Sequence, residues 1–166
     1  MPGGLFFPPR TFPLYPKDMT VLPIISSAEF PLAFATQWIA NWNARNVTAV
    51  LSHFRDDCIF ESPIAEKITG RGRLVGKEEL QKYWNEALAR IDVLRFTLDD
   101  CIWDPVRRTL VVAYTSLVDG RVTSCCEMMV FDPGGRQTTG KAYYGVAVLT
   151  QAAFCNARPN VIEGMH

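Results

Sequence analysis

The hydrophobic pattern of the chain changes its period near residue 92, and this change constrains the fold more than any other feature. Before it, apolar residues recur every three or four positions. After it, they lie in runs rich in β-branched and aromatic residues, separated by turn sequences. Helices followed by strands are typical of α+β domains, with helices on one face of an antiparallel sheet. At 166 residues, the chain is long enough for one such domain with a substantial core.

The first part of the chain predicts three helices. The first follows the capping-box pattern Ser26-x-x-Glu29 and carries Phe34, Trp38 and Trp42 at every fourth position. The other two helices are expected at residues 46–55, with Asn46 as the N-cap, and at residues 77–91. Between them, the sequence predicts a short strand at residues 58–62 and then a glycine-containing loop.

The second part predicts four strands joined as an antiparallel meander. Two-residue and four-residue turn clusters, of which Asp119-Gly120 is the strongest hairpin signal, separate them. The predicted strands cover residues 93–103, 109–117, 122–131 and 138–149.

Charge and cysteine content exclude several classes of protein. The chain has 17 Lys+Arg against 17 Asp+Glu, which argues against a nucleic-acid clamp or a polybasic membrane binder. No apolar run approaches the roughly 18–20 residues of a membrane span. The five cysteines form no CxxC pair and have no histidines at metal spacing, so we expect neither a metal site nor a disulfide framework, and no cofactor. A reducing, cytoplasmic location fits this composition best.

The two ends differ from the middle of the chain. Seven of the 11 prolines lie within the first 31 residues, which excludes a helix or a central strand there. We predict a proline-rich arm at residues 1–27, a domain at residues 28–155 and a loose tail at residues 156–166. The arm's composition fits both a segment lying along the domain or a partner subunit and a disordered segment, and Met19 is an alternative start of the chain.

Four sequence segments together carry a resemblance to a known family. They are Trp42-Asn43-Ala44-Arg45-Asn46, Phe54-x-Asp56-Asp57, Phe60-Glu61-Ser62-Pro63 and Gly76-Lys77-x-x-Leu80-x-x-Tyr83-Trp84. Their order and spacing resemble the SnoaL-like branch of the nuclear-transport-factor-2-like superfamily, over about residues 34–145. The resemblance implies a cone-shaped α+β barrel in which three helices close over a strongly curved, mostly antiparallel sheet. It also implies a deep apolar pocket and a homodimer.

The steroid isomerases of this superfamily allow a test by individual residues. Their chemistry uses a carboxylate base and an oxyanion hole made of a tyrosine and a protonated carboxylic acid. Aligned with them, this chain has Trp38 at the tyrosine position, Ser62 at the base position and Glu127 at the protonated-acid position. Only the acid is kept in type, so ketosteroid isomerisation by the same three groups is disfavoured.

Glu127 is the most informative candidate residue. It interrupts the apolar run from Cys125 to Phe131, where a carboxylate is costly unless it is protonated, paired or hydrogen-bonded. Alternation places it on one strand face with Cys125, Met129 and Phe131. If that face lines the pocket, as the resemblance implies, Glu127 has a raised pKa suited to donating a hydrogen bond or to acid–base catalysis. The alternative is a structural carboxyl bound to a tyrosine, tryptophan or arginine.

Ser62 is the second candidate catalytic residue, with a reservation. Glu61 and Ser62 alternate across their strand, and the alignment selects Ser62 for the pocket. Because no histidine or lysine is placed to activate it, Ser62 is favoured as a hydrogen-bonding residue over a nucleophile. A one-residue shift of the strand would instead make Glu61 the candidate base.

Four aromatic residues from separate elements complete the candidate site. The resemblance makes Trp38, Trp84, Tyr114 and Tyr144 the substrate-binding walls, although aromatics at such spacing are often simply core. Trp42, like Trp103, is interpreted as core. The basic stretch from Lys67 to Lys77 is interpreted as a solvated loop, with an anion clamp as the less favoured reading.

These observations favour a protein that binds a small, mostly apolar, polycyclic, polyketide or terpenoid-like molecule. It would be a cofactor-independent isomerase, cyclase or dehydratase acting by proton transfer; the alternatives are a non-catalytic ligand carrier or sensor and, less favoured, a protein-interaction module. The convex sheet face, with Cys126, Met128 and Val130, is apolar and predicts a homodimer interface.

Overall fold

The computed structural model describes residues 25, 27–146 and 148–149. Most of the predicted proline-rich arm, Cys155 and the whole of the predicted tail therefore lie outside the described residues.

Four helices and seven strands make up the described part of the chain. The helices are α1 (Phe30–Asn43), α2 (Val47–Leu51), α3 (Pro63–Thr69) and α4 (Lys77–Ala89). The strands are β1 (Phe54–Glu61), β2 (Arg73–Val75), β3 (Leu94–Asp104), β4 (Thr109–Val118), β5 (Arg121–Phe131), β6 (Gln137–Tyr144) and β7 (Val148–Leu149).

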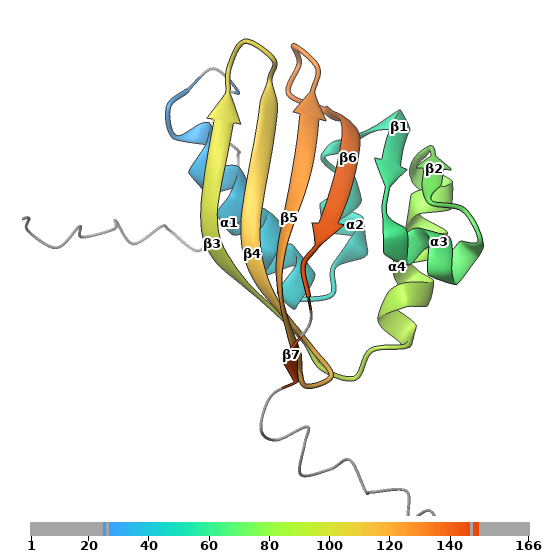
Figure 1. The fold of residues 1–166 in the computed structure, drawn as a ribbon. Coiled ribbons are helices and arrows are strands. Elements are labelled where there is room, and N and C mark those ends of the chain that lie inside the picture. Colours follow the sequence, from blue (N-terminus) through green and yellow to red (C-terminus); the bar gives the residue numbers. More distant parts are fainter. Residues whose placement is uncertain (1–24, 26, 147, 150–166) are drawn as a thin grey trace, which may run out of the picture.

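The strands form one sheet in the order β2-β1-β6-β5-β4-β3, with β7 paired to the start of β5. Strands β3 to β6 are the predicted antiparallel meander, while β1 joins the edge of β6 in parallel. The helices lie on one side of this curved sheet, and the residues that the structure describes leave its other side uncovered (Figure 1). The α+β class and the cone-shaped arrangement predicted from the sequence are confirmed.

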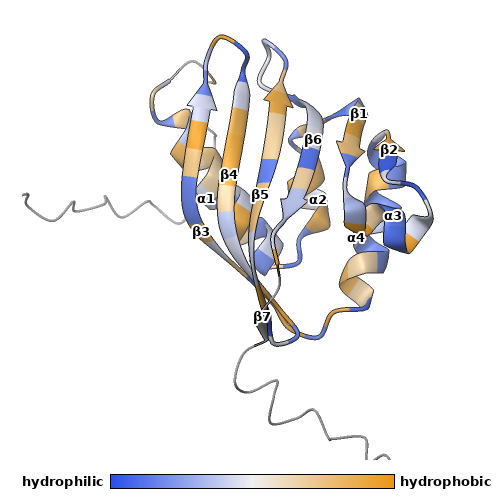
Figure 2. Cartoon of the chain, viewed as in Figure 1, coloured by the Kyte–Doolittle hydropathy of each residue, from blue (hydrophilic) through white to orange (hydrophobic). Residues whose placement is uncertain are grey.

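The core lies between the sheet and α1, α2 and α4. Helix α1 buries the residues spaced along one stripe, Phe30, Phe34, Trp38 and Trp42. Strand β4 up to Ser116 and strand β5 from Cys125 onward alternate between buried and half-buried positions, as expected of a sheet with one covered face. Figure 2 shows long apolar stretches in β4 and β5.

Several boundaries differ from the sequence predictions. The predicted helix at residues 46–55 ends at Leu51, because Phe54 already pairs with Gln137 of β6. The predicted loop after residue 62 contains α3 and β2. The predicted last strand ends at Tyr144, and Val148–Leu149 forms a separate strand.

The starts of α1 and α2 test two sequence predictions, of which the first is wrong and the second is confirmed. Glu29 is the N-cap of α1 and makes no side-chain capping bond, so the predicted capping box does not form. By contrast, Asn46 caps α2 by accepting a hydrogen bond from the Ala49 backbone N–H.

Candidate functional site

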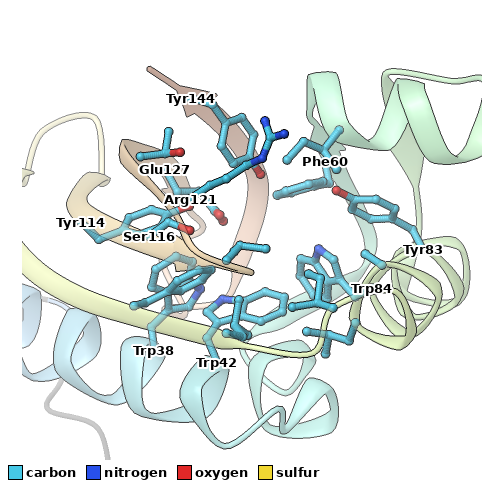
Figure 3. A pocket seen from close by; sticks show the side chains of 18 residues that line it. Trp38, Trp42, Phe60, Tyr83, Trp84, Tyr114, Ser116, Arg121, Glu127 and Tyr144 are labelled. Carbon is cyan, nitrogen blue, oxygen red and sulfur yellow. The ribbon is translucent and has the colours of Figure 1, made fainter. Parts of the chain in front are cut away.

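A cavity of about 220 Å³ lies between the concave sheet face and helices α1 and α4. Most of its walls are apolar, and aromatic side chains contribute much of them (Figure 3). Lining residues with polar atoms are Trp38, Trp42, Tyr83, Trp84, Tyr114, Ser116, Arg121, Thr123, Glu127 and Tyr144. An apolar pocket with a few converging polar groups is the usual form of a small-molecule site.

Glu127 enters this pocket from the middle of β5. Strand alternation turns Glu127 inward together with Cys125, Met129 and Phe131, and all four are buried. Its neighbours across the sheet are Val112 on β4 and Ala142 on β6, whose side chains carry no polar atom that could hydrogen-bond to the carboxyl.

The carboxyl of Glu127 is unpaired in the part of the chain that the structure describes. Glu127 is 3% exposed, and its Oε1 atom has no hydrogen-bond partner among those residues. Burial raises the pKa of Glu127 to about 8, which favours the protonated carboxyl at neutral pH. At this pH, Glu127 is therefore a buried hydrogen-bond donor and a potential proton donor.

Three tyrosines surround Glu127. Burial is the main cause of the raised pKa values of Tyr83, Tyr114 and Tyr144, and the nearby charge of Glu127 raises all three further. Although 38% of the surface of Tyr144 is exposed, its hydroxyl is desolvated in the pocket. The phenols therefore stay protonated and act as neutral hydrogen-bonding groups.

Two tryptophans of α1 form the opposite wall. Trp38 and Trp42 are one helical turn apart, and their ring centroids lie 6.1 Å from each other. Trp42 belongs to the buried core, as predicted, and both side chains also line the pocket. Trp103 packs against Phe30, with a centroid distance of 5.2 Å, and is not among the residues that line this pocket.

Ser62 caps α3 and is not among the residues that line this cavity. Its Oγ accepts hydrogen bonds from the backbone N–H groups of Ile64 at 3.1 Å and Ala65 at 3.4 Å. The hydroxyl is also close enough to Tyr83 and Tyr144 to lower their pKa values against the effect of burial. Ser62 is thus placed to order α3 and two pocket phenols.

Glu61 points away from the pocket. Its carboxylate lies 3.1 Å from Lys141 Nζ and 3.9 Å from Arg73 Nε on the outer surface. The strand register is therefore the one that keeps Ser62 buried and Glu61 at the surface.

The basic stretch is not part of this cavity. Arg71, Arg73 and Lys77 form ion pairs with nearby carboxylates, and none of them lines it. Arg121, at the start of β5, is instead the cation among the lining residues (Figure 3). It is six residues from Glu127, or roughly 20 Å along the strand, and its exposure places it at the mouth.

The comparisons with known proteins define the family of this chain. Residues 35–150 match the SnoaL-like domain, and the chain belongs to this family. A search of curated proteins finds no match.

Within the described residues, no group of three or more His, Cys, Asp or Glu side chains could hold a metal ion. No helix in the same part of the chain is long and apolar enough to cross a membrane.

Solved structures share the fold. A SnoaL-like protein of unknown function from Burkholderia thailandensis is 32% identical, with 75% of this chain and 99% of that chain covered and a TM-score of 0.65. The epoxide hydrolase/cyclase-like enzyme SalBIII, of pyran ring formation in the polyether salinomycin, is 12% identical, with coverages of 72% and 95% and a TM-score of 0.58. A steroid delta-isomerase from Pseudomonas aeruginosa is 20% identical, with coverages of 68% and 80% and a TM-score of 0.51.

Proposed function

We propose that this protein is a cofactor-independent enzyme that rearranges a small, mostly apolar molecule by acid–base proton transfer. The observation that carries the proposal is the buried carboxyl of Glu127 in an apolar cavity, where its Oε1 atom has no hydrogen-bond partner among the described residues and burial raises its pKa. A carboxylic acid kept neutral by burial can donate a hydrogen bond or a proton to a substrate oxygen. The isomerase and the cyclase-like enzyme among the structural relatives are consistent with this class of reaction.

The proton cycle can be completed by one residue. Glu127 donates its proton to an oxygen of the substrate as a C–O bond breaks or a carbonyl becomes an enol. The resulting carboxylate then takes a proton from a carbon or hydroxyl of the same molecule, which restores the acid. The net reaction is an isomerisation, a cyclisation or the loss of water, and it needs no separate base.

The remaining pocket residues bind and shape the substrate in this proposal. Trp38, Trp84, Tyr114 and Tyr144 supply the flat walls that ring-shaped molecules require. Ser62 supports the phenols of Tyr83 and Tyr144 by hydrogen bonding and does not act as a nucleophile.

The test is turnover by wild-type protein and two matched variants. Purified protein is incubated in heavy water with a panel of apolar ketones, epoxides and tertiary alcohols, and products are followed by mass spectrometry. Wild type should give a new product. An isomer formed through an enol should carry deuterium at the carbon that is reprotonated, whereas a cyclised or dehydrated product makes no new C–H bond and should carry no carbon-bound deuterium. Glu127→Gln should abolish this turnover, whereas Glu61→Gln, which changes a surface carboxylate, should retain it. Full activity of Glu127→Gln would exclude the assignment.

The pH profile gives a second check. Because the protonated form of Glu127 is the reactive one, kcat/KM should fall as pH rises through about 8. A profile that instead rises through this pH would assign Glu127 as the base.

A ligand carrier is the second candidate function. Within the described residues that line this cavity, Glu127 is the only carboxylate and there is no histidine, so any proton transfer depends on Glu127 alone, and a pocket in which Glu127 only binds would be a carrier. A carrier would release every bound ligand unchanged, and the same mass spectra distinguish the two functions.

We also propose a homodimer formed through the uncovered sheet face. The half-buried Val111, Met128 and Val130 share this face, and Ile102 is 66% exposed beside them. An apolar sheet face without a covering layer is commonly buried by a second subunit.

A further inference from the structure

Two buried hydrogen-bond donors in the pocket have no acceptor. Trp38 is 1% exposed and Trp42 is 7% exposed, and both line the cavity. The Nε1 atoms of both indoles lack a partner among the residues that the structure describes. Buried polar groups in folded proteins are normally hydrogen-bonded, so two unpaired donors on side chains that line one cavity call for an explanation.

The rings around these indoles do not supply the missing acceptor. Trp38 contacts the rings of Phe96 and Tyr114, at centroid distances of 6.3 and 5.4 Å, and Trp42 contacts Trp84 at 5.0 Å. These neighbours offer ring faces, which accept hydrogen bonds only weakly. The geometry of α1 keeps the two donors together, because residues four apart share one helix face.

The indoles lie opposite the acid. Figure 3 shows Trp38 and Trp42 entering the pocket from α1, while Glu127 enters it from the sheet. Indole N–H groups can only donate hydrogen bonds, and a protonated carboxyl also presents a donor. A ligand that carries two acceptor oxygens could therefore bind the indole N–H groups with one oxygen and the Glu127 carboxyl with the other.

We propose that the indole N–H groups of Trp38 and Trp42 form a second polar subsite that binds an acceptor oxygen of the ligand. The ligand is then an apolar molecule with two carbonyl, ether or epoxide oxygens, one for Glu127 and one for the indoles. This inference rests on the proposed small-molecule function of the cavity and adds the chemical class of its ligand.

The experiment uses the indole N–H signals of the full chain. Protein labelled with ¹⁵N-tryptophan has four indole signals, one for each tryptophan of the sequence. It is titrated with three apolar diones of increasing size: cyclohexane-1,4-dione, the bicyclic Wieland–Miescher ketone and androst-4-ene-3,17-dione. Trp38→Phe and Trp42→Phe assign the signals. The dione that binds should move the Trp38 and Trp42 signals downfield and leave Trp103 in place.

Affinities measured on the same variants give an independent result. Trp38→Phe and Trp42→Phe keep an aromatic ring and remove the donor, so each should weaken dione binding by about three- to tenfold. Trp103→Phe is the matched control outside the lining residues and should change the affinity by less than about twofold.

The outcomes separate the two proposals. One outcome is that a dione binds, that Glu127→Leu weakens this binding, and that the Trp38 and Trp42 signals do not move. In that case the subsite is overturned and the proposed function stands. If none of the three diones binds to wild-type protein, the subsite is overturned, whereas the proposed function is decided by the turnover assay described above. The shifts themselves are observed in wild-type protein, and the tryptophan variants serve there only to assign the signals.

Discussion

Tyr114 and Glu127 lie diagonally across the β4–β5 pair and face the same cavity. Tyr114 is opposite Cys125, and Glu127 is opposite Val112, so the two side chains are one diagonal step apart on the concave face. The charge of Glu127 raises the pKa of Tyr114, in addition to the larger effect of burial. Burial thus keeps a carboxylic acid and a phenol protonated side by side at neutral pH.

The ionisation of Glu127 should be visible in the pH dependence of stability. Its pKa rises from 4.5 to about 8 on folding, so between these values the folded state holds a proton that the unfolded state has lost. As pH rises between these two values, Glu127 should therefore lower the free energy of unfolding by about 1.4 kcal/mol per pH unit. Glu127→Gln removes the effect and should be the more stable protein at pH 8. Urea unfolding of both proteins at pH 5–8.5 measures the difference, and parallel slopes would contradict it.

The fold was predictable because its elements agree locally and globally. The period of four in α1 and the alternation in β4 and β5 each correspond to one buried face in the structure. The turn sequences likewise end the strands near the predicted positions. Where local pattern and tertiary pairing disagreed, pairing prevailed: Phe54 has helical spacing from Val50, yet it starts β1 beside β6.

Helix α3 was missed although its signals are present in the sequence. Ser62 is a good N-cap, Pro63 fits the first helical position, and Gly70 ends the helix with φ of 75°. Of the seven residues of this helix only Ala65 is buried, so the helix lacks the apolar stripe by which the other helices were found.

The candidate site was only partly predictable. Glu127 stood out because a carboxylate in an apolar strand demands an explanation from sequence alone. The place of Trp42 in the pocket wall was not predictable, because its helical spacing is the same for a core residue. The place of Arg121 among the lining residues could be predicted only from strand alternation, because Arg121 lies an even number of residues from Glu127 and so shares its face of β5.

The double role of Ser62 can be separated by substitution. Ser62→Ala removes the N-cap of α3, which should lower the free energy of unfolding by about 1 kcal/mol, while Ser62→Thr keeps a capping hydroxyl and should lose less. Denaturant unfolding measures both variants. On the active protein, Ser62→Ala should reduce kcat/KM far less than Glu127→Gln. An equal loss in the two variants would make Ser62 a catalytic residue.

The proposed dimer is tested on the uncovered sheet face. Met128→Glu places a charge in the middle of that face and should convert a dimer to a monomer, because an unpaired charge in an apolar interface is strongly unfavourable. Val106→Glu is the matched control, since Val106 is 85% exposed in the β3–β4 turn. Light scattering after gel filtration gives the mass of each species. A wild-type monomer at micromolar concentration would refute the dimer.

Gly140 provides a test of how tightly β6 packs against the pocket wall. A Cβ atom at Gly140 would lie 2.8 Å from the Phe60 ring and 3.0 Å from Gln137 Nε2, closer than side chains tolerate. Gly140→Ala should therefore destabilise the protein by about 1–3 kcal/mol and displace Phe60, which lines the cavity. Gly72→Ala is the control, because the nearest atom to its Cβ is Glu66 Cβ at 3.6 Å. Thermal unfolding and dione affinity of both variants measure the two effects, and equal stability of the two variants would contradict the prediction.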